Sequence, residues 1–272
     1  LLQNQIARGR RSCQVHLRHQ RHGKCAQMAD ILQNAIPYAA EFDAALPGIA
    51  PLGPDAWIVK DEVFAAQMAA RDRLMAHRAP LVHAECGASV AAKAEVLDAV
   101  LTILKTRDGY RVTQAAVTRP DGVTIAMQGD PLFVAAQLIQ EDLCLHEKKG
   151  SEHVLTAAVM CFPASWTLAE KIGRPLSAIH QTVARYDENL GKRVQRLFDG
   201  VQAGRPLWRY NMLRYRSPEL FHPRREAAPR QSDNDFGGGD YLRSEHQAVV
   251  RMPDSQAVLF AIHTYLVKEP QK

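Results

Sequence analysis

Residues 241–266 read YLRSEHQAVVRMPDSQAVLFAIHTYL, and this stretch decides the fold. Its two halves are rich in residues that favour β-strands, while Pro253, Asp254 and Ser255 between them are turn formers. The stretch therefore predicts a hairpin of two long strands at residues 241–252 and 258–266. Working outward, three further segments have the composition of strands, and the first two flank a turn at residues 148–150. They are residues 143–147, 154–162 and 207–215.

Helical patterns occur before these strands and between them. Residues 61–77 and 89–105 have amphipathic periodicity, and Asp130 followed by Pro131 is a typical helix start for a segment ending near residue 140. A short helix is expected at residues 168–172 and a longer one at residues 188–201. The stripe expected to face the core in the second helix is Val90, Ala94, Leu97, Leu101 and Leu104. Strands interspersed with helices predict an α+β domain around a five-stranded, mostly antiparallel sheet with flanking helices.

Composition sets the limits on domain organisation and partners. The chain has 272 residues and a net charge of +5, but residues 1–28 carry six basic residues and no acid. We expect a disordered basic arm there, with Met28 as a plausible natural start, followed by a single domain at residues 29–272. The rest of the chain is close to neutral, which argues against nucleic acid as a partner except through the arm.

Apolar runs and cysteines indicate the compartment. The apolar runs are short and interrupted, so we expect no membrane span. Five scattered cysteines without a CxxC pair favour a reducing compartment, and thus a cytoplasmic location.

Two motifs imitate metal sites. Cys13, His16, His19, His22 and Cys25 recur every three residues, but this spacing spreads side chains around a helix rather than converging them. Residues 233–244 begin like a calcium loop but end in Ser244 instead of glutamate, so a plain loop is the better interpretation.

The strand at residues 241–252 carries a row of polar side chains. Alternation places Arg243, Glu245, Gln247 and Arg251 on one face, and Leu242, Ala248, Val250 and Met252 on the other. Two interpretations are open. The row is either the solvated side of an antiparallel sheet or the polar wall of a ligand pocket, in which Glu245 pairs with a cationic amine.

Several dispersed motifs resemble one known family in the same order along the chain. They are QEDLCL at residues 140–145, FPASW at 162–166, KIGRPL at 171–176 closing on Ile179 and His180, Arg209 and Asn211, Leu242 and Arg243 with Glu245 and Gln247, and Leu259, Phe260 and Ile262. Together they resemble the haem-dependent oxidative N-demethylase family, alpha subunit. The resemblance covers residues 36–266 and is most specific at residues 131–265.

The resemblance implies a fold, an activity and partners. The fold would be a PAS-like haem-binding domain with a five-stranded antiparallel sheet and helices over one face. The activity would be O2-dependent oxidation of a small secondary amine. Electrons would come from reductase subunits that carry the FMN, iron–sulfur and tetrahydrofolate cofactors. This chain has no dinucleotide fingerprint or iron–sulfur cysteine pattern of its own.

The resemblance also assigns residues. His180 is the histidine within a matched motif, so it is the expected axial ligand of haem b, with Trp166 in the same cofactor region. Lys171 and Arg174 are expected to pair with the haem propionates. Glu245 would hold the amine, with Arg243 and Gln247 shaping the wall around it.

Two questions stay open at the level of sequence. The chain departs from the family pattern after His180, at Met212, and around His246, which leaves the identity of the amine open. A haem or small-ligand sensor without turnover would share the same fold and motifs, because fold does not fix function.

Overall fold

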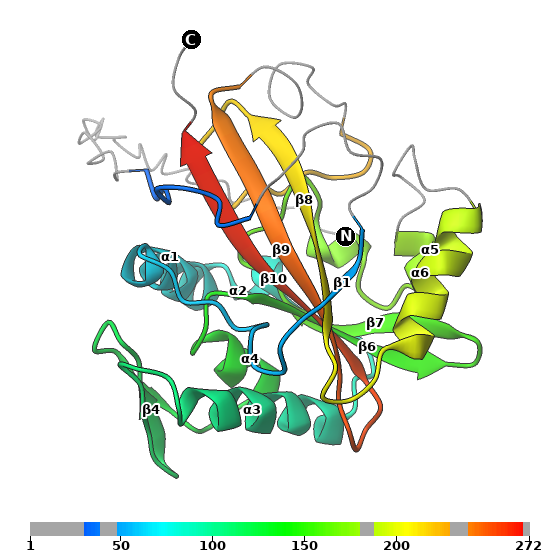
Figure 1. The fold of residues 1–272 in the computed structure, drawn as a ribbon, viewed down its shortest axis with the longest axis horizontal. Coiled ribbons are helices and arrows are strands. Elements are labelled where there is room, and N and C mark those ends of the chain that lie inside the picture. The colour runs from blue at the N-terminus through cyan, green and yellow to red at the C-terminus, as the bar shows by residue number, and fades with distance from the viewer. Residues whose placement is uncertain (1–29, 39–47, 180–187, 229–238, 269–272) are drawn as a thin grey trace, which may run out of the picture.

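The computed structural model describes residues 30–38, 48–179, 188–228 and 239–268. One large sheet forms the centre of the described part, with strand order β1-β8-β9-β10-β6-β7-β2 (Figure 1). Five of its strands are long: β6 (Asp142–Lys149), β7 (Glu152–Val159), β8 (Leu207–Tyr215), β9 (Tyr241–Arg251) and β10 (Val258–Lys268). All neighbouring pairs are antiparallel.

The five expected strands are therefore confirmed, but the expected number of strands in the sheet is wrong. The sheet has seven strands because two short ones extend its edges, β1 (Ala50–Pro51) beside β8 and β2 (His83–Glu85) beside β7. Strands of two or three residues have too few positions for an alternating pattern to be recognised.

Helices cover both faces of the sheet. One face carries α1 (Phe64–His77), α2 (Ala79–Val82), α3 (Val90–Leu104) and α4 (Pro131–Ala136), as Figure 1 shows. The other carries the 3-10 turn η1 (Leu168–Glu170) with α5 (Leu176–Ile179) and α6 (Glu188–Gly200). Two consecutive residues of β9 point to opposite faces of the sheet. Val250 packs in the main core, whereas Val249 packs with Phe198 of α6. The α+β class is confirmed, but helices over one face alone are not what the structure contains.

Helix α3 begins where the sequence predicts, since the Ser89 side chain accepts a hydrogen bond from the Ala92 N–H. Its buried face differs from the expected stripe. Val90 is 70% exposed, while Lys93 is 6% exposed and pairs with Glu85 and Asp130, each at 2.5 Å. The buried positions are Ala92, Lys93, Val96, Val100, Ile103 and Leu104. Two acidic partners from other elements draw a charged side chain inward, and periodicity alone cannot reveal such partners.

A small second sheet was not expected from the sequence. It consists of β3 (Arg111–Val112), β4 (Ala116–Thr118) and β5 (Thr124–Ala126). Arg119 follows β4 and is buried, and it donates to both Asp72 and Asp121. This pairing joins the small sheet to α1.

The basic arm, with its cysteines and histidines, and residues 233–238 of the calcium-like loop lie outside the described residues. Among the helices that the structure describes, none has the length and apolar character needed to cross a membrane.

Candidate functional site

A row of polar side chains crosses β8 and β9 on the face that carries α5 and α6. In the strand register Arg209 lies opposite Gln247, and Asn211 lies opposite Glu245. Glu245 is only 5% exposed and Arg243 only 2%. The solvated-face interpretation is therefore wrong for these two residues, whereas Arg209, Asn211 and Gln247 in the same row are half-buried.

Glu245 is held firmly through one of its two carboxylate oxygens. Oε2 accepts hydrogen bonds from Asn211 Nδ2 and from Gln247 Nε2, both at 2.8 Å. The main-chain N–H of Glu245 donates to Asn211 Oδ1 at 3.0 Å. Oε1 makes no hydrogen bond within the described part of the chain, so one oxygen remains available to a ligand.

Arg209 is a cation on the same face whose charge interacts with that of Glu245. Burial lowers the pKa of its guanidinium, and the charge of Glu245 partly offsets that effect. Its buried Nε atom has no hydrogen-bond partner among the described residues. Carboxylate and guanidinium thus share a poorly solvated face without a direct hydrogen bond between them.

Arg243 occupies the same row but points its donors elsewhere. Its guanidinium donates to the main-chain oxygens of Leu220 at 3.0 Å and Phe162 at 2.5 Å, and lies 5.7 Å from the centre of the Tyr215 ring. In this arrangement Arg243 braces the segments that border the polar row.

An apolar wall lies beside the polar row on the same face of the sheet. Its buried members are Cys144, Leu155, Ala158, Met160, Leu168 and Ile262, with Trp166, Ile172, Ile179 and Phe260 packed against them. Burial raises the pKa of the Cys144 thiol, so this cysteine stays neutral and apolar in character. Trp166, expected to lie near the cofactor, packs against this apolar surface.

The two expected propionate partners differ in availability. Lys171 is 5% exposed, and its Nζ donates to the Ile179 carbonyl at 2.6 Å and to Glu226 at 2.5 Å. The Arg174 side chain is 44% exposed and reaches Glu226 only at 3.5 Å. Lys171 therefore fixes the last residue of α5, whereas the Arg174 side chain remains partly open to solvent.

A family model described as "Haem-dependent oxidative N-demethylase, alpha subunit-like" matches residues 48–270. This chain belongs to that N-demethylase alpha-subunit-like family. The match spans both the polar row and the apolar wall, so the sequence resemblance to this family is confirmed.

The expected haem ligand of this N-demethylase-like chain, His180, lies outside the described residues. It directly follows Ile179, the residue whose carbonyl Lys171 holds. Elsewhere in the described ranges, no group of three or more histidine, cysteine or acidic side chains is arranged to hold a metal ion.

The QED motif at residues 140–142 of this N-demethylase-like chain is structural. Gln140 donates to Asp61 and Gln67, each at 2.8 Å. Asp142 accepts from Arg71 at 2.5 Å and from the main-chain N–H groups of Cys161 and Phe162. The motif therefore ties α1 to the sheet and positions the start of the segment that leads to Trp166.

Glu141, the middle residue of that motif, belongs to a buried ionic cluster that the sequence analysis did not identify. Its Oε1 lies 3.1 Å from His263 Nδ1, and Asp61 lies 3.1 Å from His263 Nε2. Burial lowers the pKa of His263, but the hydrogen bonds that its ring donates to Asp61 and Glu141, together with their charges, outweigh it and raise that pKa to about 9. Alternation along β10 predicts that His263 lies on the face opposite Thr264 and Ile262. It does not predict the ionic cluster, because Asp61 and Glu141 are distant from His263 in the sequence.

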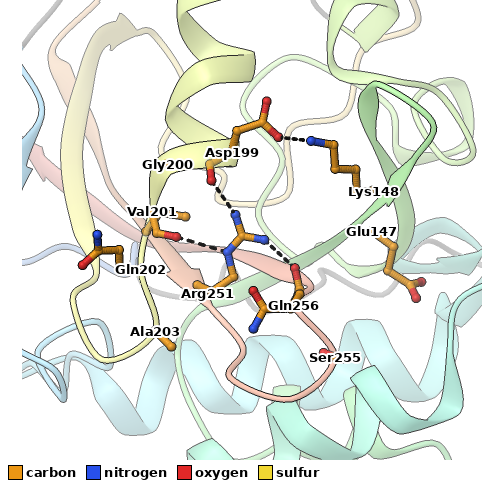
Figure 2. Close-up of a pocket in the computed structure, with 10 residues that line it drawn as sticks. All are labelled: Glu147, Lys148, Asp199, Gly200, Val201, Gln202, Ala203, Arg251, Ser255 and Gln256. Atoms are coloured by element: carbon orange, nitrogen blue, oxygen red, sulfur yellow. Dashed lines mark hydrogen bonds and ion pairs between the residues drawn. The ribbon is translucent and has the colours of Figure 1, made fainter.

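A polar hollow of about 690 Å³ lies between the end of α6, the β6–β7 hairpin and the turn after β9 (Figure 2). Arg251 is at its centre and donates to the carbonyls of Val201 at 3.1 Å and Gln256 at 2.6 Å, and also to Phe198. Lys148 pairs with Asp199 at 2.5 Å across it. Because both cations already have partners, the hollow is a hydrogen-bonded seam and adds no ligand site.

Proposed function

We propose that this chain is the haem-dependent, amine-oxidising subunit of an oxidative N-demethylase. The observation that carries the proposal is Glu245, a nearly buried carboxylate with one oxygen fixed by Asn211 and Gln247 and the other without a hydrogen bond to any residue that the structure describes. Arg209 shares this face but makes no hydrogen bond to Glu245, so Oε1 lacks a donor among the described residues, and a buried charged oxygen without one is costly. A protonated small amine supplies both the charge and an N–H donor.

The apolar wall supports a site for haem next to this carboxylate. A porphyrin presents a broad apolar ring and two carboxylates, and the wall from Cys144 to Trp166 offers apolar contact. We assign His180 as the axial ligand of haem b, with Arg174 as a propionate partner and Lys171 fixing the end of α5. Bound haem would supply an iron with an open position for O2.

The residues of the chain have separate tasks in this proposal. Glu245 binds the ammonium group and orients one N-methyl carbon toward the cofactor, while Gln247 and Asn211 keep the carboxylate still. Arg243 braces the wall through Phe162 and Leu220. The overall reaction balances as dimethylamine, O2, two electrons and two protons giving methylamine, formaldehyde and water.

The electrons must come from elsewhere, and we propose reductase subunits with FMN and iron–sulfur centres, and a partner with tetrahydrofolate to accept the released carbon. The family's description as an alpha subunit supports assembly with other chains. We further propose that residues 29–272 form one PAS-like domain in the cytoplasm, with the five adjacent long strands as its core and β1 and β2 as additions.

The test is to load the full chain with haem and compare wild type with Glu245→Gln, using dimethylamine, O2 and an artificial electron donor. We expect a Soret band in both proteins and amine-dependent formaldehyde in the wild type. The variant should lose about tenfold to a hundredfold in amine affinity, as removal of a charged hydrogen bond implies. Glu152→Gln is the matched control, because Glu152 lies at the start of β7, at the far end of the β6–β7 hairpin.

Two results would contradict the proposal. Equal amine affinity in wild type and Glu245→Gln would remove the carboxylate from the site. Haem binding without any amine-dependent formaldehyde would instead identify the chain as a haem sensor.

A further inference from the structure

The carboxylate of Glu245 is linked through the sheet to a residue on the opposite face. Asn211 contacts Glu245 at two points, since its Nδ2 donates to Glu245 Oε2 at 2.8 Å and its Oδ1 accepts from the Glu245 N–H at 3.0 Å. This pairing fixes both the main chain and the side chain of Glu245. It leaves Asn211 itself to be held by something else.

Ser244 supplies that support from the other face of β9. The Ser244 hydroxyl donates to the main-chain oxygen of Asn211 at 2.7 Å, and Ser244 is fully buried. A carbonyl can only accept, so the single hydroxyl proton of Ser244 is committed to Asn211. The 2.7 Å contact between Tyr38 and Ser244 must then have Tyr38 as its donor.

Tyr38 is itself fixed in an aromatic cluster. Its ring centre lies 5.0 Å from Tyr210, 5.4 Å from Trp208, 5.8 Å from Tyr265 and 6.3 Å from His246. Burial raises the pKa of the Tyr38 phenol, so the hydroxyl keeps its proton throughout the neutral range. The segment of residues 30–38 is thus anchored on the face of the sheet that is opposite to Glu245.

We propose that Asn211 is the positioning residue of Glu245, and that Tyr38 and Ser244 set its orientation from across the sheet. Tyr38 donates to Ser244, and Ser244 donates to the main-chain carbonyl of Asn211. The side-chain amide of Asn211 then donates to Glu245. The inference rests on the proposed role of Glu245 in amine binding. It adds that residues 30–38 determine how well this carboxylate is placed, although they do not reach the site.

The test measures binding of dimethylammonium by calorimetry on the haem-loaded full chain between pH 5 and pH 9. Asn211→Asp keeps the side-chain shape and the acceptor, but it places a second carboxylate beside Glu245. Like charges disfavour ionisation, so the acid limb of amine binding should move up by about one pH unit or more. The affinity at neutral pH should fall, and a change in the pH profile is not expected from a merely structural role.

Tyr38→Phe tests the link across the sheet, since it removes one hydroxyl and leaves the ring in place. Amine affinity should fall about twofold to tenfold, as expected for one lost hydrogen bond. Tyr241→Phe is the matched control, because the Tyr241 hydroxyl also ties this segment to β9, through Asp30 at 3.2 Å, but has no contact with Ser244. The control should change affinity less than about twofold.

The possible results separate this inference from the proposed function. An unshifted acid limb in Asn211→Asp would overturn the role of Asn211, and equal effects of Tyr38→Phe and Tyr241→Phe would overturn the link across the sheet. If Asn211→Asp does not fold, Tyr38→Phe still decides the matter. If Glu245→Gln binds dimethylammonium as tightly as the wild type, the proposed function itself fails.

Discussion

Glu141 Oε1 lies 3.1 Å from His263 Nδ1, and neither side chain has exposed surface. Asp61 holds the other ring nitrogen of His263, so the imidazolium is clamped between two acids from distant parts of the chain. The cluster joins the helix-bearing N-terminal half to β10, the centre of the sheet.

This clamp predicts a pH dependence of stability. The pKa of His263 rises from 6.5 in the unfolded chain to about 9 in the folded one, so its contribution is complete below pH 6.5 and is lost as pH rises through about 9. Urea unfolding at several pH values should show stability falling by a few kcal/mol across that window. His263→Gln should be less stable at neutral pH and should lack the alkaline decline. The same decline in the variant would exclude His263 as its source.

The Arg71–Asp142 pair predicts an asymmetric response to substitution. Both side chains are almost fully buried, at 0% and 1% exposed, and Asp142 also holds two main-chain N–H groups. Arg71→Met should cost about 3–5 kcal/mol of unfolding free energy, because it leaves a buried carboxylate without its cation. Lys148→Met is the control for the exposed pair with Asp199 and should cost less than about 1 kcal/mol. Similar losses in the two variants, measured by urea unfolding, would contradict this account.

Lys171 and Arg174 should affect haem binding for different reasons. Lys171→Met releases the Ile179 carbonyl beside His180, so it should weaken haem binding about tenfold, both for haem and for its dimethyl ester. Arg174→Met should weaken binding of haem but not of the ester, which lacks propionate charges. Soret titrations with the two porphyrins measure this difference. Loss of ester binding in Arg174→Met, or its retention in Lys171→Met, would reverse the assignment.

Much of the fold was predictable because its long elements carry strong local patterns. Period two along β9 places Glu245 and Gln247 on one face, and the hydrogen bond between them agrees, although burial itself does not alternate along this strand. The short edge strands β1 and β2 carry no such pattern, and the buried Lys93 depends on Glu85 and Asp130 from other elements. Local periodicity cannot represent partners that are distant in sequence.

The candidate site was predicted in part for the same reason. Glu245 and Gln247 share a face by alternation, but the contacts of Asn211 depend on the register between β8 and β9, which the sequence does not display. The burial of Arg243 and Glu245 depends on what covers that face, so the sequence alone left a solvated face open. The ionic cluster at His263 brings together residues about 120 and 200 positions apart, and no motif announces it.

The central claim is that Glu245 binds a protonated amine beside haem. The most direct measurement is formaldehyde release from dimethylamine by the haem-loaded full chain, compared between wild type and Glu245→Gln. We predict a Soret band in both proteins, amine-dependent formaldehyde in the wild type, and amine affinity lower in the variant. A wild-type protein without a Soret band, or a variant with undiminished affinity, would contradict the account.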